Sequence, residues 1–255
     1  MLQENSLFFV PQRRLAPKLR FFYFPFAGGS AQSYQHWHHC SDPDIELVFV
    51  QLKGRGSQIG EQPHQSMQQL VDELISHSDY LTEYPFVIFG HSMGALISYA
   101  LCCELNKLKL PLPLHLFVSA CRAPHLPYLN QIRHTLPSDQ FIQALAQLKG
   151  TPVEVLHNKE LMDLFEPMLR ADFKIAETYQ ADRVQMPFSI SVFYGDEDSS
   201  VANHQLKAWE ELTEKSCVIS AFPGDHFFIN KNSQQLTETM HLQTALLMEQ
   251  MALGN

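Results

Sequence analysis

Short apolar segments alternate with helical patterns along most of this 255-residue chain, and this alternation limits the possible folds more than any other feature. Helical patterns cover 65–77, 93–108, 204–212 and 233–251. Between them lie segments with the length and composition of buried strands: 19–26, 45–52, 85–90, 115–120, 188–195 and 217–222, with 6–10 as a candidate edge strand. Strands that alternate with helices predict an α/β fold, in which helices flank both faces of a mostly parallel central sheet.

Residues 122–184 interrupt the alternation, because they contain no convincing strand. A helix is predicted after Ser138, a suitable N-cap, and it should end at Gly150. A second helical region, rich in large apolar side chains, runs through 161–173. We expect a single domain over 1–255 in which this insertion forms a lid over the functional site. An additional packing layer without a gating role is the alternative.

The charge balance and the absence of long apolar runs exclude several classes of protein. Lys and Arg number 18 against 27 Asp and Glu, so the net charge is −9 and the surface should repel nucleic acid. No apolar run approaches the roughly 18 residues that span a bilayer. Gln3 and Glu4 stand where a signal peptide carries positive charge. We therefore expect a cytoplasmic protein without a nucleic-acid or membrane partner. Separately, we expect the chain to be a monomer.

The five cysteines form an odd set without a CxxC spacing, which is typical of buried thiols in a reducing compartment. His36, His38 and His39 stand beside Cys40, a grouping that raises the possibility of zinc. No second ligand cluster with a recognisable spacing accompanies them. We expect a polar helix face or loop there, with no metal and no other cofactor.

The most specific motif is GHSMG at residues 90–94. A strand pattern leads directly into it and a helical pattern leads out, which is the context of the strand–serine–helix turn of a serine hydrolase. The glycines let neighbouring backbone approach this turn, and the helix N-terminus directs partial positive charge at the reacting centre. Ser92 is therefore the candidate nucleophile, and the alternative is a structural turn with an inert serine.

A serine nucleophile needs a general base, and the best candidate is His226, which follows the last predicted strand. The other downstream histidines, His204 and His241, lie within predicted helices. The carboxylate that orients the base should follow the preceding strand. Hydrolases with this turn commonly place it three residues after the strand-ending glycine, which selects Asp198 over Asp196.

An oxyanion hole requires two backbone N–H donors near the nucleophile. Met93 follows Ser92 directly and supplies one candidate amide. The second should come from the loop after an early strand, where the glycines of FPFAGGS at 24–30 allow the backbone to turn its amides inward. Ala27 is the best candidate there. The same loop lacks the lysine and spacing of a phosphate-binding Walker motif.

Six motifs in the same order resemble those of type II thioesterases of nonribosomal peptide and polyketide synthesis: FPFAGGS, LKGRG at 52–56, GHSMG, SACRAP at 119–124, GDED at 195–198 and GDHFF at 224–228. The resemblance implies the α/β-hydrolase fold, with Ser92 as nucleophile, Asp198 as acid and His226 as base. It also implies oxyanion donors at Ala27 and Met93. Two positions depart from the family pattern: Gly56, where an acidic residue is common, and Asp225, where glycine is common.

The resemblance further implies hydrolysis of acyl groups from the phosphopantetheine arm of a carrier domain. A thioesterase acting on acyl-coenzyme A, a carboxylesterase and a catalytically inactive partner of a synthase remain alternatives. Carrier domains are generally acidic, so a protein with a net charge of −9 needs a local basic region to dock one. The candidate docking residues lie in the 122–184 insertion: Arg122, Arg133, Arg170, Lys174 and Arg183.

Overall fold

The computed structural model describes residues 6–40 and 42–253 and contains a seven-stranded sheet in the order β1-β3-β2-β4-β5-β6-β7. The strands are β1 (Phe8–Phe9), β2 (Leu19–Phe24), β3 (Ile45–Val50), β4 (Phe86–His91), β5 (His115–Ser119), β6 (Ser189–Gly195) and β7 (Cys217–Phe222). Strand β1 pairs antiparallel with β3, and all the other pairs are parallel. The predicted α/β fold is confirmed.

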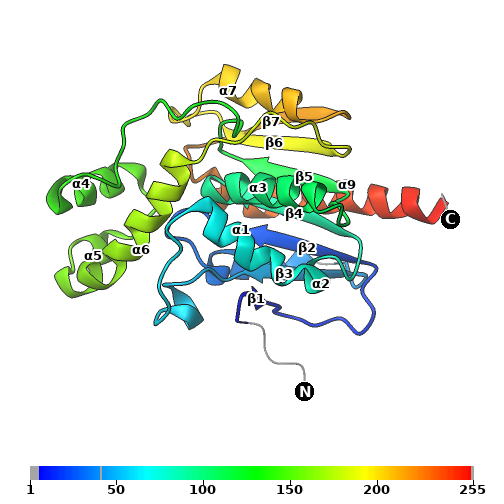
Figure 1. The fold of residues 1–255 in the computed structure, drawn as a ribbon, viewed down its shortest axis with the longest axis horizontal. Coiled ribbons are helices and arrows are strands. Elements are labelled where there is room, and N and C mark those ends of the chain that lie inside the picture. Colours follow the sequence, from blue (N-terminus) through cyan, green and yellow to red (C-terminus); the bar gives the residue numbers. More distant parts are fainter. Residues whose placement is uncertain (1–5, 41, 254–255) are drawn as a thin grey trace.

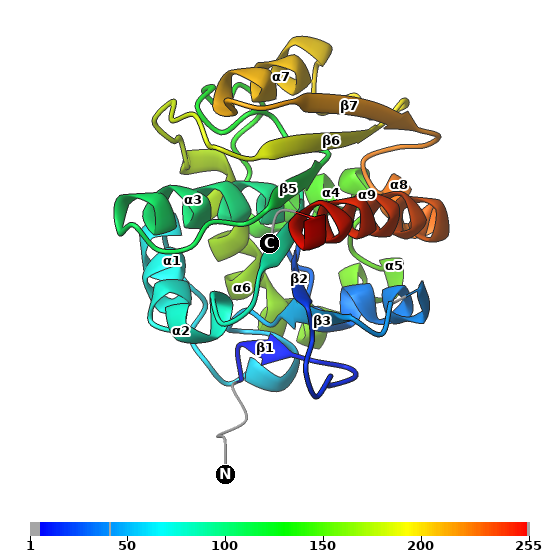
Figure 2. The same ribbon diagram turned by 90° about the vertical axis from the view of Figure 1, so that its right-hand side faces the viewer.

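Helices cover both faces of this sheet (Figure 2). One face carries α1 (Met67–Ile75), α2 (Ser78–Leu81) and α3 (Met93–Lys107), and the other carries α9 (Ser233–Leu253) and the 3-10 helix Ala31–Cys40. Shorter helices follow β6 and β7: α7 (Asn203–Lys207), the 3-10 helix Ala208–Leu212 and α8 (Phe228–Lys231). A further 3-10 turn spans Gly56–Gln58.

The side chains of β2 show how one strand supplies two cores. Phe22 and Phe24 pack with α1 and α3, whereas Phe21 and Tyr23 pack with α9 and the 3-10 helix on the opposite face. All four side chains are fully buried. Because successive residues of a strand point to opposite faces, an uninterrupted aromatic run is the pattern of a strand that is covered on both sides.

The 122–184 insertion, which the structure describes throughout, contains three helices and no strand. These helices are α4 (Ser138–Leu148), α5 (Val153–Leu156) and α6 (Lys159–Thr178), and they enclose a small apolar cluster of their own. In Figure 1 they lie beyond the carboxyl ends of the parallel strands, where the strands continue into the loops that carry the candidate site residues. This position suits a lid.

Two details of helix α4 differ from the sequence prediction. Pro137, rather than Ser138, is the N-cap; Ser138 is the first helical residue and its hydroxyl donates to Glu166 Oε1. At the other end, the left-handed residue is Lys149 (φ 58°) and not Gly150. A Cβ at Gly150 would lie 2.4 Å from Cζ of Phe227, so a larger residue there would displace that ring.

His115 makes the stability of the fold dependent on pH. Burial lowers the pKa of His115 to about 4, and its ring Nε2 lies 2.9 Å from the Ser191 hydroxyl. Between pH 6.5 and 4 the unfolded chain binds a proton that the folded chain does not, so this contribution is complete above pH 6.5 and is lost toward pH 4. A His115→Gln variant should therefore lose less unfolding free energy than wild type between pH 7 and pH 5.

The expected difference between the two proteins is about 2 kcal/mol, measured by urea unfolding at both pH values. Substitution of the exposed His204 by Gln serves as the control and should leave the wild-type pH dependence in place. Identical pH dependence in the His115→Gln variant and in wild type would show that His115 is protonated equally in both states.

Candidate active site

Ser92 occupies a strained turn between β4 and α3. Its φ of 53° and ψ of −116° are unusual for a residue with a side chain, and its N–H donates to Ser119 O at 2.8 Å. A Cβ on Gly90 would lie 2.3 Å from Gly94 O, and one on Gly94 would lie 2.2 Å from Phe24 O. Both glycines of the GHSMG motif are thus sterically required, as the sequence predicted.

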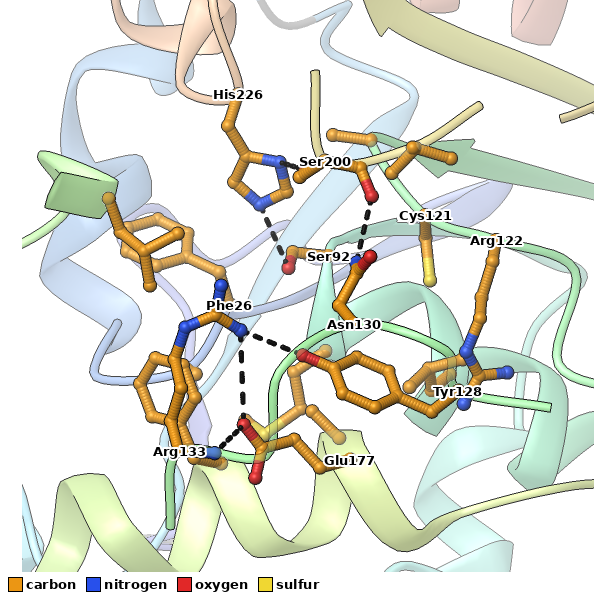
Figure 3. Close-up of a pocket in the computed structure, with 18 of the residues that line it drawn as sticks. Phe26, Ser92, Cys121, Arg122, Tyr128, Asn130, Arg133, Glu177, Ser200 and His226 are labelled. Atoms are coloured by element: carbon orange, nitrogen blue, oxygen red, sulfur yellow. Dashed lines mark hydrogen bonds and ion pairs between the residues drawn. The ribbon is translucent and has the colours of Figure 1, made fainter. Parts of the chain in front are cut away.

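The side chains of Ser92, His226 and Asp198 form one hydrogen-bonded chain (Figure 3 shows the Ser92–His226 contact). Nε2 of His226 lies 3.1 Å from Oγ of Ser92, and Nδ1 of His226 lies 2.8 Å from Oδ2 of Asp198. These residues follow the carboxyl ends of β4, β7 and β6 respectively. The parallel sheet thus brings together residues that are 134 positions apart in the sequence.

The structure distinguishes Asp198 from its neighbour Asp196. The Asp198 side chain is 3% exposed, whereas Asp196 is exposed and its Oδ1 accepts the N–H of Gly224 at 2.9 Å. Asp196 thereby ties the loop after β6 to the loop that carries His226. Burial raises the pKa of Asp198, but hydrogen bonds from His226 and Ser200 outweigh burial and hold that pKa below its usual value.

Ser200 is a site residue that the sequence interpretation missed. Its hydroxyl donates to Asp198 Oδ1 at 2.6 Å and lies 3.1 Å from Nδ1 of His226, while its backbone N–H also donates to Asp198 Oδ1. A serine two residues after an aspartate is the usual signal of such a local turn. That signal does not reveal the contact with His226, which lies 26 residues further along the chain.

The loop after β2 lies against the same site. Gly29 N–H donates to Phe26 O at 2.8 Å and closes a tight turn, in which Gly28 has a φ of 79°. Ala27 and Met93 line one pocket together with Ser92 and His226. The two amides expected to form an oxyanion hole therefore belong to residues on the wall of the Ser92 pocket.

This pocket has a volume of about 120 Å³ and is lined mainly by apolar groups from the sheet loops and the insertion. Its polar residues include three that the sequence interpretation did not connect: Tyr128, Arg133 and Glu177. Nη1 of Arg133 donates to the Tyr128 hydroxyl at 2.7 Å and lies 3.9 Å from Glu177 Oε1 (Figure 3). The pocket is thus an apolar cavity, and one of its walls contains the hydrogen-bonded and charged side chains of Tyr128, Arg133 and Glu177.

The two departures from the family pattern have local structural explanations. Gly56 has a φ of 52°, and a Cβ there would lie 2.9 Å from the Gln51 side chain, so no larger residue fits without rearrangement. Asp225 accepts the N–H of Phe227 at 3.1 Å and lies 3.7 Å from Nζ of Lys149. Neither residue alters the chain from Ser92 to Asp198.

The candidate docking residues differ in exposure. Arg122 is only 6% exposed, and its guanidinium donates to the carbonyl oxygens of Leu126 and Tyr179, so its expected role in docking is contradicted. Arg133 lines the pocket, and Arg170 pairs with Glu166 on its own helix. The two exposed residues are Lys174 and Arg183, of which Arg183 pairs with Glu211.

Among the described side chains, no group of three His, Cys, Asp or Glu residues could hold a metal ion. The side chains of His38, His39 and Cys40 lie outside the described ones.

Cys102 and Cys121 are buried, and burial raises the pKa of Cys121 to about 12. No helix within residues 6–40 and 42–253 is long and apolar enough to cross a bilayer.

The strand–serine–helix turn, followed by a carboxylate and a histidine on later loops of a mainly parallel sheet, identifies an α/β-hydrolase. Comparison with known families refines this class. Residues 20–244 match the family model described as "Thioesterase domain". The chain therefore belongs to the thioesterase family.

Individual relatives support the same assignment. The chain is 38% identical over 248 residues to the gramicidin S biosynthesis protein GrsT of Aneurinibacillus migulanus. The matched region covers 96% of this chain and 96% of GrsT. ClbQ from the colibactin NRPS/PKS pathway superimposes with a TM-score of 0.83 at 32% identity, covering 90% of this chain and 98% of ClbQ. YbtT, a type II thioesterase of the yersiniabactin pathway, gives a TM-score of 0.82 at 28% identity and covers 92% of this chain and 96% of YbtT.

Proposed function

We propose that this thioesterase is a type II, editing enzyme that hydrolyses acyl groups from the phosphopantetheine arm of carrier domains in a peptide or polyketide assembly line. The contact of 3.1 Å between His226 Nε2 and Ser92 Oγ, in the wall of an apolar pocket, carries the catalytic part of the proposal. The pathways named for GrsT, ClbQ and YbtT support the carrier-domain substrate.

In the proposed mechanism, Ser92 Oγ attacks the thioester carbonyl carbon while His226 Nε2 accepts the hydroxyl proton. Asp198 orients the imidazole through Nδ1 and stabilises its positive charge. The amides of Ala27 and Met93 donate to the oxyanion. The carbon–sulfur bond then breaks and His226 protonates the leaving thiolate. A water molecule that loses a proton to His226 hydrolyses the acyl-enzyme, which releases the acid and restores Ser92.

The arrangement of Ser92, His226 and Asp198 does not distinguish thioesters from oxygen esters, so rates on matched substrates must do so. One acyl group would be presented on a carrier domain, on coenzyme A and as an oxygen ester. Our proposal requires the highest kcat/KM for the carrier-bound thioester. A preference for the coenzyme A thioester would favour the acyl-CoA thioesterase alternative, and a preference for the ester would favour a carboxylesterase.

Replacement of the proposed nucleophile tests the mechanism directly. Ser92→Ala should lower kcat by about four to six orders of magnitude, because alanine has no oxygen that could attack the thioester and form the acyl-enzyme. The variant should also lose labelling by a fluorophosphonate, detected by intact-protein mass spectrometry. A folded Ser92→Ala protein that keeps most of its turnover would exclude this mechanism. Failure of the wild-type protein to react at all would favour an inactive synthase partner.

The two aspartates after β6 provide a matched pair of variants. Asp198→Asn keeps the shape of the side chain but no longer stabilises the imidazolium, so kcat should fall by about 10⁴. Asp196→Asn removes only the charge from an exposed acceptor of the Gly224 amide and should change kcat by less than about tenfold. Steady-state rates on a small acyl thioester measure both. The reverse order would assign the orienting role to Asp196.

Lys174 is the candidate docking residue that remains exposed without an ion pair among the described residues. Lys174→Glu should raise KM for an acyl-carrier substrate several-fold and weaken its dependence on ionic strength. Hydrolysis of a small acyl thioester should be unchanged. Lys215→Glu is the control, because exposed Lys215 precedes the amino end of β7, opposite the insertion. Equal KM values for both variants would place docking elsewhere.

A further inference from the structure

Helix α6 of the insertion contacts the loop after β2 through two residues on one helical face. Leu169 and Asp172 are three positions apart, and both reach Gly28. A Cβ on Gly28 would lie 2.7 Å from Leu169 Cδ2, and the Gly28 N–H donates to Asp172 Oδ2 at 2.8 Å. The helix therefore fixes the residue that follows Ala27 both by packing and by a charge-assisted hydrogen bond.

Arg55, from the LKGRG motif, completes the contact. Its Nη1 and Nη2 donate to Asp172 Oδ2 and Oδ1 at 2.5 and 2.7 Å, and Nη1 also donates to Gly29 O at 3.1 Å. The side chains of Arg55 and Asp172 are 4% and 3% exposed. One bidentate, buried ion pair thus holds the amide of Gly28 and the carbonyl of Gly29 at the same time.

Residues of the loop after β2 line two different cavities. Ala27 lines the pocket that contains Ser92, whereas Gly28 and Arg55 line a second cavity of about 330 Å³ between the loop and the insertion. The Gly28 N–H belongs to the peptide that joins Gly28 to Ala27, and the Ala27 N–H belongs to the preceding peptide, so only φ and ψ of Ala27 separate the two groups. The hydrogen bond from Gly29 N–H to Phe26 O closes a turn around both peptides and limits these two angles. The position of the Ala27 amide therefore depends on a carboxylate that belongs to the insertion.

We infer that Asp172 and Arg55 are positioning residues for the oxyanion hole, and that they couple its geometry to the docking of helix α6. This inference rests on the proposed function, because it requires Ala27 to stabilise an oxyanion formed at Ser92. When α6 is docked, Gly28 has its acceptor and Arg55 its counter-ion. Movement of α6 away from the loop removes both and leaves the guanidinium without a counter-ion, with only the carbonyl oxygens of Lys53 and Gly29 as acceptors, which is costly.

A second buried ion pair in this chain provides a matched control. Arg20 Nε donates to Glu46 Oε2 at 2.8 Å, with side chains 7% and 6% exposed. Both residues lie at the amino ends of their strands, opposite the site. Loss of either ion pair should lower stability, but only loss of the Asp172 pair should change the chemistry at Ser92.

The test compares Asp172→Asn with Glu46→Gln on a small acyl thioester, so that carrier docking does not contribute. For Asp172→Asn we expect kcat to fall by ~10²-fold with KM within about threefold of wild type, as for loss of one oxyanion donor. Affinity for an acyl trifluoromethyl ketone, which forms a tetrahedral adduct on the serine, should fall by the same factor as kcat/KM. Glu46→Gln should keep both values within about twofold of wild type.

Arg55→Lys is the second variant, in case Asp172→Asn does not fold. It keeps the charge but loses the planar fork, so it should lose kcat by about tenfold with little change in KM. Unchanged kcat and adduct affinity in either folded variant, or equal losses in Glu46→Gln, would overturn the inference. Ser92→Ala separates the two proposals: if it is inactive while Asp172→Asn behaves as wild type, only the inference fails, and if it is active, the proposed mechanism fails.

Discussion

The contact between Gly94 and the end of β2 fixes the turn of Ser92 against the loop that follows β2, and the rest of the site is arranged around this turn. Only a hydrogen atom on Gly94 separates the start of α3 from the Phe24 carbonyl, since a Cβ would lie 2.2 Å from that oxygen. The contact fixes α3, and therefore Ser92 and Met93, relative to the loop that continues from Phe24 to Ala27. The two proposed oxyanion donors come from these two segments, so this backbone contact holds the segments close together, and the contacts of Gly28 and Gly29 then hold the loop itself.

The insertion adds a second set of constraints through buried carboxylates on helix α6. Asp172 holds the loop after β2, and Glu177 accepts the N–H groups of Arg133 and His134, which support another wall of the pocket. Buried ion pairs contribute little net stability, because desolvation offsets most of their attraction. Their strict geometry instead defines where the helix sits, which is what a pocket built from two distant parts of the chain requires.

The sequence predicts the elements that depend on local patterns. The strands, the main helices and the strained turn at Ser92 follow from apolar spacing and glycine positions. The order of the strands along the chain then selects Asp198 and His226, because each lies in the loop that follows one of the last two strands. Contacts between distant side chains are not encoded in any local pattern. Asp172 and Arg55 lie 117 residues apart and meet only in the folded chain.

Helix ends show the same limitation on a smaller scale. The predicted cap at Ser138 was displaced by one residue, because Pro137 and Ser138 both suit the start of a helix and tertiary contact with Glu166 engages the serine hydroxyl. Lys149, rather than Gly150, adopts the left-handed conformation, and Phe227 lies in the space that a side chain at position 150 would need. Both helix ends lie against residues from other segments, which the local sequence pattern does not contain.

His91, the histidine of the GHSMG motif, lies beside His226 in an aromatic environment. Its ring lies 5.3 Å from that of His226 and contacts Phe26, Phe227 and Phe228. Burial lowers the pKa of His91 well below its usual value, and the neighbouring His226 lowers it further.

A neutral His91 matters because the proposed mechanism places a positive charge on His226 during attack. A second charged imidazole at this distance would oppose that charge, whereas a neutral ring does not. Asp198 contacts His226 directly and its lowered pKa keeps it ionised, so the imidazolium faces one carboxylate and no competing cation from His91. The aromatic packing around the GHSMG turn thus favours the proposed proton transfer at His226.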